Sequence, residues 1–281
     1  MRTLQGGIYT GERALFQAHD MKICDAVFED GESPLKHSRN IETYDTAFKW
    51  RYPVWYSKNV EMYGCTVFEG ARAGMWYTDD LTMRDCIVAA PKCLRRCRDV
   101  VLENVSFPDA PETLWDCHSV KLGNVTANGD YFGMNCSDME IDDLRLTGHY
   151  HFDGVKNVTI RNSRLITKDA FWNSENVTVE NSYISGEYIG WNSKHLTFIN
   201  CTIESLQGLC YVDDLVIRGC KFINTTLAFE YSTVEASIIG GIDSIKNPSG
   251  GTICADSIGE LILEEDMVDV SKTKICCRAA C

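Results

Sequence analysis

Four charged side chains in the middle of the sequence have the types needed for acid–base chemistry on a sugar. The carboxylates Glu112 and Asp116 lie four residues apart, and the cations Lys92 and Arg96 precede them. Paired carboxylates can act as acid and base at a glycosidic bond, and a cation can hold an anionic group of the substrate. If the protein is an enzyme, these are its candidate catalytic residues, and the activity is that of a glycosidase or polysaccharide lyase.

The same residues also have a structural interpretation. The charges change from basic to acidic between Lys92 and Glu112, and Arg95 and Arg96 precede Asp116. Opposite charges on neighbouring strands form a ladder of ion pairs, and structural ion pairs often resemble sites. We favour the ladder interpretation, and the catalytic interpretation stays open beside it.

The elements that position these residues follow from an internal repeat. An apolar lead position recurs at intervals of 19 to 21 residues, and weaker members follow near Ile238 and Leu261. The lead positions are Met21, Ile41, Val60, Leu81, Val100, Val120, Met139, Val158, Val177, Leu196 and Leu215. Such a period is typical of a solenoid.

Each repeat predicts two short strands joined by a corner. Apolar or small residues fall at the lead position and at +2, +5 and +7, and spacing by two is typical of a strand. The position at +4 is always Asn, Asp or Gly: Asp25, Asp45, Gly64, Asp85, Asn104, Asn124, Asp143, Asn162, Asn181, Asn200 and Gly219. These residue types tolerate positive φ best, which predicts a one-residue corner there.

A third strand is predicted after a variable loop, in segments such as Val54-Trp55-Tyr56-Ser57 and Phe171-Trp172-Asn173-Ser174. The spacing fits leucine-rich, pentapeptide and left-handed hexapeptide repeats poorly. We therefore predict an all-β fold: a single-stranded right-handed parallel β-helix of about twelve coils of 19–21 residues. One domain is expected over 1–281, with a cap at 1–17, coils over 18–257, and the last coil and a second cap over 258–281.

Two columns of side chains along the third strand give the binding hypothesis. The polar column is interpreted as facing outward, because so many polar groups are rarely buried without partners. The adjacent column, with Trp55, Trp76, Phe152 and Trp172, would then point inward, although a register shift of one residue would expose it. The candidate ligand-binding residues are Tyr56, Tyr77, Arg95, Asn135, Asp153, Asn173, Asn192 and Tyr211. A further column at the junction between loop and strand contains Arg51, Arg72, Lys92, Glu112, Asp130, Asp169, Glu187 and Gln207.

The amino-acid composition argues against two classes of binding partner. The formal net charge is −13, which disfavours nucleic acid and anionic membranes, and no apolar run is long enough for a membrane helix. The first residues lack an apolar signal region, so we expect a cytoplasmic protein whose 14 cysteines are mostly thiols. His149 and His151 alternate on one strand and the chain ends in a cysteine-rich tail, but neither pattern predicts a metal site. We expect no metal and no cofactor.

The corner ladder and the variable loop resemble the pectate-lyase-like right-handed β-helix superfamily. More narrowly, segments such as Lys168-Asp169-Ala170-Phe171-Trp172-Asn173 and Leu227-Ala228-Phe229-Glu230-Tyr231 resemble a bacterial family of that fold with no assigned function. The resemblance covers nearly the whole chain and implies the fold, and it supplies no chemistry. The Gly-His-Gly element of polygalacturonases does not occur in the sequence.

The leading hypothesis is therefore a β-helix protein that binds or processes a carbohydrate or carbohydrate-like ligand along an aromatic and polar face. The alternative is a noncatalytic structural or protein-interaction scaffold. The sequence names neither the substrate nor the oligomeric state.

Overall fold

The alternation of apolar and polar residues produces short parallel strands that wind into a right-handed type of β-solenoid with almost no helix. The computed structural model describes residues 1–277. Two compact units divide the chain: an N-terminal unit, Met1–Arg145, and a C-terminal unit, Leu146–Cys281. The predicted fold class is confirmed. The expectation of a single domain over 1–281 stays a prediction.

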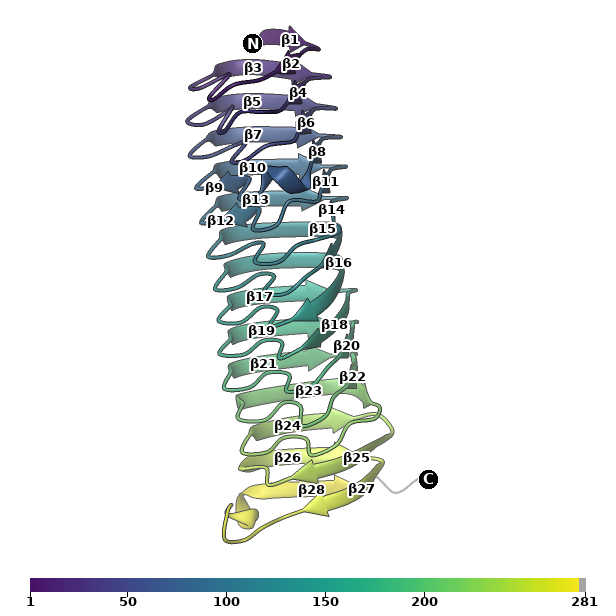
Figure 1. Ribbon diagram of the computed structural model, residues 1–281. Coiled ribbons are helices and arrows are strands. Elements are labelled where there is room, and N and C mark those ends of the chain that lie inside the picture. The colour runs from purple at the N-terminus through teal and green to yellow at the C-terminus, as the bar shows by residue number, and fades with distance from the viewer. Residues whose placement is uncertain (278–281) are drawn as a thin grey trace. The chain divides into compact units, whose positions relative to one another are not determined.

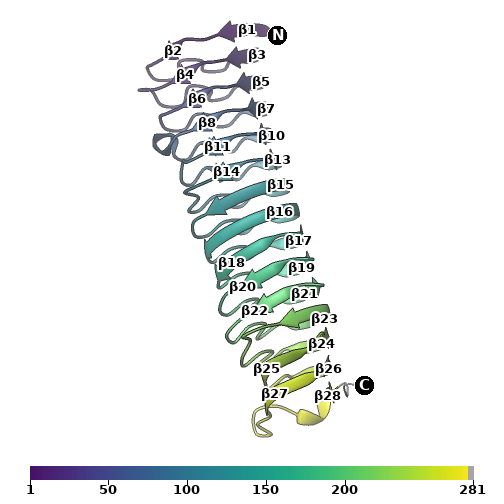
Figure 2. The same cartoon turned by 90° about the vertical axis from the view of Figure 1, so that its right-hand side faces the viewer.

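In the N-terminal unit, the first strands of successive coils pair in parallel and lie side by side (Figure 1). These strands are β1 (Arg2–Gln5), β3 (His19–Cys24), β5 (Arg39–Tyr44), β7 (Lys58–Tyr63), β10 (Asp79–Arg84), β13 (Arg98–Glu103) and β15 (His118–Asn128). The short second strands form another parallel ladder (Figure 2). They are β2 (Ile8–Tyr9), β4 (Val27–Phe28), β6 (Ala47–Phe48), β8 (Thr66–Val67), β11 (Ile87–Val88) and β14 (Ser106–Phe107). The remaining elements are η1 (Glu69–Ala71), the paired β9 (Met75–Trp76) and β12 (Leu94–Arg95), and β16 (Ser137–His149), which contains the boundary between the units.

The C-terminal unit repeats the same pattern with longer second strands. Its first strands are β17 (Lys156–Arg161), β19 (Glu175–Glu180), β21 (Lys194–Ile199), β23 (Asp213–Phe222), β24 (Thr233–Ile238), β26 (Gly250–Ala255) and β28 (Thr273–Cys277). Its second strands are β18 (Arg164–Lys168), β20 (Tyr183–Ser185) and β22 (Thr202–Glu204). A separate parallel pair, β25 (Gly241–Lys246) and β27 (Ser257–Ile262), and η2 (Val270–Lys272) complete it.

The predicted lead positions are aligned by the strand register. Met21 pairs with Ile41 and Ile41 with Val60 in the N-terminal unit. Val177 pairs with Leu196 and Leu196 with Leu215 in the C-terminal unit. Each of these side chains is buried, so the lead column forms part of the core.

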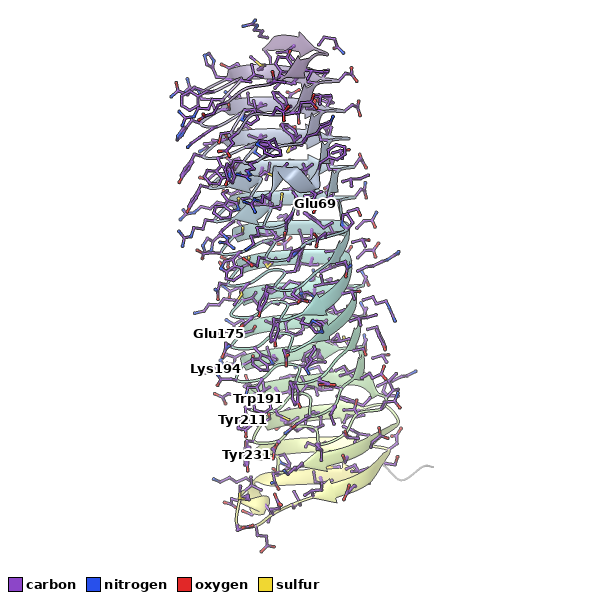
Figure 3. All side chains as sticks on the ribbon, viewed as in Figure 1. Glu69, Glu175, Trp191, Lys194, Tyr211 and Tyr231 are labelled. Carbon is purple, nitrogen blue, oxygen red and sulfur yellow. The ribbon has the colours of Figure 1, made fainter. Side chains whose placement is uncertain are left out.

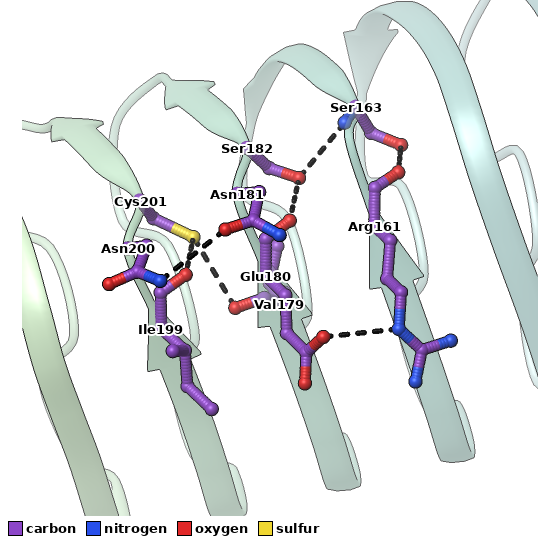
Figure 4. A network of polar contacts seen from close by, with 9 residues as sticks. All are labelled: Arg161, Ser163, Val179, Glu180, Asn181, Ser182, Ile199, Asn200 and Cys201. Carbon is purple, nitrogen blue, oxygen red and sulfur yellow. Dashed lines mark hydrogen bonds and ion pairs between the residues drawn. The ribbon is translucent and has the colours of Figure 1, made fainter.

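The predicted corners are confirmed. All eleven residues at the +4 position have positive φ, from 46° at Asp45 to 63° at Gly219. The corner amides also bind one another between coils, as where the Asn200 Nδ2 donates to the Asn181 Oδ1 at 3.4 Å (Figure 4). Behind the corner, the buried Ser182 hydroxyl donates to the Glu180 carbonyl oxygen at 2.7 Å and accepts from the Ser163 N–H at 3.0 Å. The polar groups of the bend are therefore satisfied inside the repeat.

Three details differ from the prediction. The described part of the chain contains about 15 coils rather than twelve, because β1 already pairs with β3 and the last coils are more numerous. The weaker repeat members are displaced, since Leu215 pairs with Val234, while Ile238 pairs with Cys220 beyond a bulge and Leu261 belongs to β27.

The third difference is the predicted third strand, which consists mostly of turns. Asp169, Phe171 and Asn173 all have positive φ, between 53° and 59°. A residue in the left-handed region cannot continue an extended strand, so only two-residue strands such as β9 and β12 form at this place in the coil. The side chains of these turns therefore do not follow the alternation of a strand.

Candidate functional site

Glu112 is the centre of the charged cluster in the N-terminal unit. Its Oε1 lies 2.9 Å from the Lys92 Nζ and its Oε2 lies 3.0 Å from the Arg95 guanidinium. Lys92 and Glu112 occupy turns with positive φ, and Arg95 ends β12. The turns of consecutive coils thus bring three of the sequence-predicted residues into one ion-paired group.

The electrostatics of this group favour an ionised carboxylate. Burial acts to raise the pKa of Glu112, but the hydrogen bonds and charges of Lys92 and Arg95 outweigh it and hold the pKa below its ordinary value. A general acid needs the opposite shift. Both oxygens of Glu112 are already occupied by cations, which is the arrangement expected of a ladder of ion pairs.

Asp116 has its own cation. The Arg96 Nε lies 3.1 Å from the Asp116 Oδ2, and another guanidinium nitrogen of Arg96 donates to the Tyr77 hydroxyl at 3.4 Å. The hydrogen bond with Asp116 raises the pKa of Arg96 further above its ordinary value. The four candidate catalytic residues therefore form two ion-paired groups, and their catalytic roles remain predictions.

The tryptophans of this column do not point inward, which corrects the favoured orientation, whereas Phe152 of the same predicted column is fully buried. Trp55 and Trp76 are half-buried, while the residue before each, Val54 or Met75, is fully buried in the core. The positive φ at the next residue reverses the in–out order that a strand would impose. The two indole rings stack at 5.4 Å and 8°, and the Trp76 Nε1 donates to the Lys92 carbonyl oxygen at 2.7 Å.

Arg95 extends this stack. Its guanidinium carbon lies 4.6 Å from the centre of the Trp76 ring and 4.8 Å from that of Trp115. Its Nε is buried and has no hydrogen-bond partner among the described residues. Cation–π contact on both faces and the ion pair with Glu112 together hold this cation in place.

The tyrosine column lies beside the tryptophans and faces outward, as predicted. Tyr56 and Tyr77 stack at 4.6 Å and 4°, and His37 continues the stack at 5.3 Å from Tyr56. Asn135 is also exposed, with φ of 53°. Because the rings cover one another's faces, this surface offers ring edges and hydroxyl groups.

A pocket of about 330 Å³ opens between the tryptophan column and the junction column of the N-terminal unit. It is lined by Tyr52, Trp55, Arg72, Ala73, Trp76, Pro91 and Lys92. Backbone hydrogen bonds place Ala73 in register with Tyr52 and Lys92, since the Tyr52 N–H binds the Arg72 oxygen and the Ala73 N–H binds the Pro91 oxygen. The same pattern of hydrogen bonds shows that the predicted junction column was wrong by one residue at Arg51, Arg72, Asp130 and Glu187. The small Ala73 between two long side chains leaves the space.

In the C-terminal unit the predicted polar column forms an amide ladder. The Asn192 Nδ2 donates to the Asn173 Oδ1 at 2.8 Å, and the Asn173 Nδ2 donates to the Asp153 Oδ1 at 3.0 Å. The placement of Asp153 in this column was wrong by one residue, because the Gly154 N–H binds the Trp172 oxygen as the Asn173 N–H binds the Trp191 oxygen.

Aromatic side chains accompany this ladder on successive coils (Figure 3). Trp191 lies 4.4 Å from Tyr211, and Tyr211 lies 5.2 Å from Tyr231, between ring centres. The carboxylate beneath them, Glu230, is buried and binds the Lys246 Nζ and the Gln207 Nε2, each at 2.9 Å.

The histidine pair does not share one face. His149 is exposed and His151 is fully buried, because Tyr150 between them has φ of 58°. Within residues 1–277, no group of three or more His, Cys, Asp or Glu side chains could hold a metal ion. The cysteines described there are free thiols, and Cys281 of the cysteine-rich tail lies outside the described residues. No helix in that part of the chain is long and apolar enough to cross a membrane.

Comparison with known proteins identifies the family to which this chain belongs. The model of a family described as a protein of unknown function, DUF3737, matches residues 2–276. The chain belongs to this family. No curated protein matches the sequence. The family membership confirms the resemblance to an uncharacterised β-helix family.

Solved structures similar to this DUF3737 protein are β-helix proteins. A tailspike protein double mutant of E. coli bacteriophage HK620 has a TM-score of 0.50 at 9% identity, covering 97% of this chain and 72% of its own. The Streptococcus pneumoniae surface protein and adhesin PfbA has a TM-score of 0.49 at 10% identity, covering 91% and 90%. The A-module of the Azotobacter vinelandii mannuronan C-5 epimerase AlgE6 has a TM-score of 0.41 at 10% identity, covering 93% and 90%. At these identities the likeness concerns the fold.

Proposed function

We propose that this protein binds a carbohydrate carrying an anionic group in the pocket of the N-terminal unit. The observation that supports this proposal is that aromatic and cationic side chains line the same pocket. Trp55, Trp76 and Tyr52 supply apolar surface, and Arg72 and Lys92 supply positive charge. Sugar-binding sites need apolar surface for the C–H faces and charged or polar groups for the hydroxyl and acid groups.

The charge around the pocket supports an anionic ligand. Beside Arg72 and Lys92, the Lys36 Nζ lies 5.8 Å from the Trp55 ring, and Arg95 lies behind Trp76. Glu112 pairs with Lys92 and Arg95, whereas Lys36 and Arg72 have no ion pair within residues 1–277, on a chain whose net charge is −13. A local positive potential on an acidic protein attracts an anion.

Arg72 is the residue that a ligand would engage. It is exposed, lines the pocket and has no ion pair within residues 1–277, whereas Lys92 is committed to Glu112. A guanidinium can bind a carboxylate, sulfate or phosphate group through two parallel hydrogen bonds. Binding and not turnover is proposed, since the ion-paired state of Glu112 favours the ladder interpretation.

The experiment is a glycan array followed by tryptophan fluorescence titration with the best acidic glycan. We expect Arg72→Ala to weaken binding at least tenfold, because a charge-assisted contact is lost. Arg98→Ala is the matched control, since Arg98 is also an exposed arginine of this unit, on β13, away from the pocket lining. Wild-type affinity in the Arg72→Ala variant would overturn the proposal. No glycan binding, with a stable protein complex captured instead, would favour the scaffold alternative.

A further inference from the structure

The first coil of the N-terminal unit has an open strand edge. On one side β1 pairs with β3, and β2 pairs with β4. No described segment lies on the other side of β1 in Figures 1 and 2. The backbone N–H and C=O groups of such an edge can bind a further strand, which is why solenoids need a covering at their ends.

Part of the apolar core is also uncovered at this end. Leu4 pairs with Ile23, and Leu15 lies in register with Leu35, because the Leu15 N–H binds the Pro34 oxygen. Ile23 and Leu35 are fully buried, whereas Leu4 and Leu15 are half-buried. The two leucines therefore leave apolar surface that one more coil would cover.

A pocket of about 450 Å³ opens beside the edge. It is lined by Met1, Arg2, Gln17, Ala18, His19, Asp20 and Met21. The oxygens of Asp20 already bind the His19 Nδ1 at 3.0 Å and the Asn40 Nδ2 at 2.7 Å. Arg2 is exposed and has no ion pair within residues 1–277, so the pocket has a cation that an acidic partner could bind.

The last described coil of the C-terminal unit has the matching features. β28 pairs with β26, and Ile275 is half-buried where its partner Ile253 is fully buried. We call residues 263–269, which connect β27 with η2, the acidic loop. Its exposed side chains include Glu264, Glu265, Asp266 and Met267. Met267 is 54% exposed, and neither Glu265 nor Asp266 has an ion pair within the part of the chain that the structure describes.

The two ends agree in register. Leu4 and Ile275 belong to the same column of the repeat, two residues after the lead position. If a second copy continued the stack, its β28 would pair with β1 and its Ile275 would lie against Leu4. The acidic loop comes just before η2 and β28, and the pocket is lined by residues at the start of β1 and just before β3. The loop of the second copy would therefore lie at the pocket.

We propose that the protein assembles head to tail, with the C-terminal end of a second copy bound to the N-terminal end of the first. β28 of the second copy extends the sheet of β1 in parallel, so both edges gain hydrogen bonds. The acidic loop contacts Arg2, and Met267 packs in the pocket beside Met21. Two N-terminal ends would bring Arg2 against Arg2, and two C-terminal ends would bring acidic loops together, so charge favours unlike ends. A contact between two different surfaces repeats from copy to copy, so the assembly grows with concentration.

The test is sedimentation velocity of the full chain over a hundredfold range of concentration. We expect species larger than a dimer to form as concentration rises. Leu4→Lys and Met267→Lys should each weaken self-association at least tenfold, because each puts a cation into one of the two surfaces. The matched controls are Thr3→Lys, at an exposed neighbour on β1, and Ile223→Lys, at an exposed apolar residue of the C-terminal unit outside the acidic loop. Both controls should assemble at least as well as the wild type.

A mixture of the two variants tests the head-to-tail geometry. Leu4→Lys keeps its C-terminal end intact and Met267→Lys keeps its N-terminal end intact, so an equimolar mixture should form dimers and nothing larger. Thermal unfolding shows whether each variant is folded. Arg2→Glu, at an exposed residue, replaces Leu4→Lys if that variant does not fold.

Three results would overturn the proposal: a wild type that stays monomeric at every concentration, a mixture that stays monomeric, or wild-type assembly in Met267→Lys. The last result would indicate a contact between two N-terminal ends. None of them bears on the Arg72 proposal, which is tested with glycans and other variants.

Discussion

Replacing Glu112 by Gln distinguishes an ion-pair ladder from an acid–base site. The substitution keeps the shape and removes the charge that holds Lys92 and Arg95. The Glu112 side chain is 29% exposed, Arg95 is 23% and Lys92 is 48% exposed, so solvent screens both pairs in part. Exposed pairs contribute about 0.2–1 kcal/mol and charged hydrogen bonds up to about 3 kcal/mol. We expect a loss of about 1–2 kcal/mol, which lowers Tm by about 3–6 °C.

The assay is urea and thermal unfolding of wild type and Glu112→Gln at several pH values. Because the pKa of Glu112 is depressed in the folded state, its contribution is present above its ordinary value of 4.5 and is lost as pH falls through the folded value. The difference between the proteins should therefore be full at pH 7 and shrink as pH falls below 4.5. The matched control is Glu140→Gln, since Glu140 and Lys121 are both more than 60% exposed at 3.5 Å. Equal stability at pH 7, or a difference that does not shrink below pH 4.5, would refute the reasoning.

Three further predictions concern the fold. Asn181→Val should cost about 1–2 kcal/mol in urea unfolding, because φ is 49° at this corner, whereas Asn181→Gly should cost little. Glu230→Ala should lower the urea midpoint at least as much as the Glu112 variant, since it leaves Lys246 without its buried partner; an unchanged midpoint would contradict this. Burial raises the pKa of the Cys97 thiol well above its usual range, so Cys97 should react with a disulfide reagent only after unfolding, while the exposed Cys277 reacts in the folded protein; mass spectrometry of the labelled peptides checks this.

The strands and corners could be predicted because their signal is local. An Asn, Asp or Gly recurs four residues after each apolar lead position, and these residue types adopt positive φ most readily. The recurrence therefore predicts a corner at the same place in each coil. The register then follows from equal spacing, as between Val177 and Leu196. The number of coils was underestimated because Arg2–Gln5 and the last coils depart from the lead pattern, although they still pair in parallel.

The orientation of the third segment could not be predicted by alternation. Alternation assumes an extended chain, and Tyr56 and Tyr77 have positive φ, which redirects the side chains on either side of them. Trp55 therefore lies on the surface, while Val54 enters the core. The variable loops add a second source of error, since one extra residue shifts a column, as happened at Asp153.

Regular stacking satisfies nearly every polar group, and the proposed ligand pocket lies where a ladder is interrupted. Ala73 stands three residues before Trp76, and Asp169 stands three residues before Trp172. The Nε1 of each tryptophan donates a hydrogen bond to a backbone oxygen of the following coil. Ala73 lies in register between Tyr52 and Lys92, and Asp169 lies in register between Tyr150 and Tyr188. The first interruption leaves a pocket beside Arg72, and at the second the burial of the Asp169 carboxylate raises its pKa. A gap between stacked side chains is not marked by any residue type, which is why a repeat pattern that predicts the coil does not predict where a ligand binds.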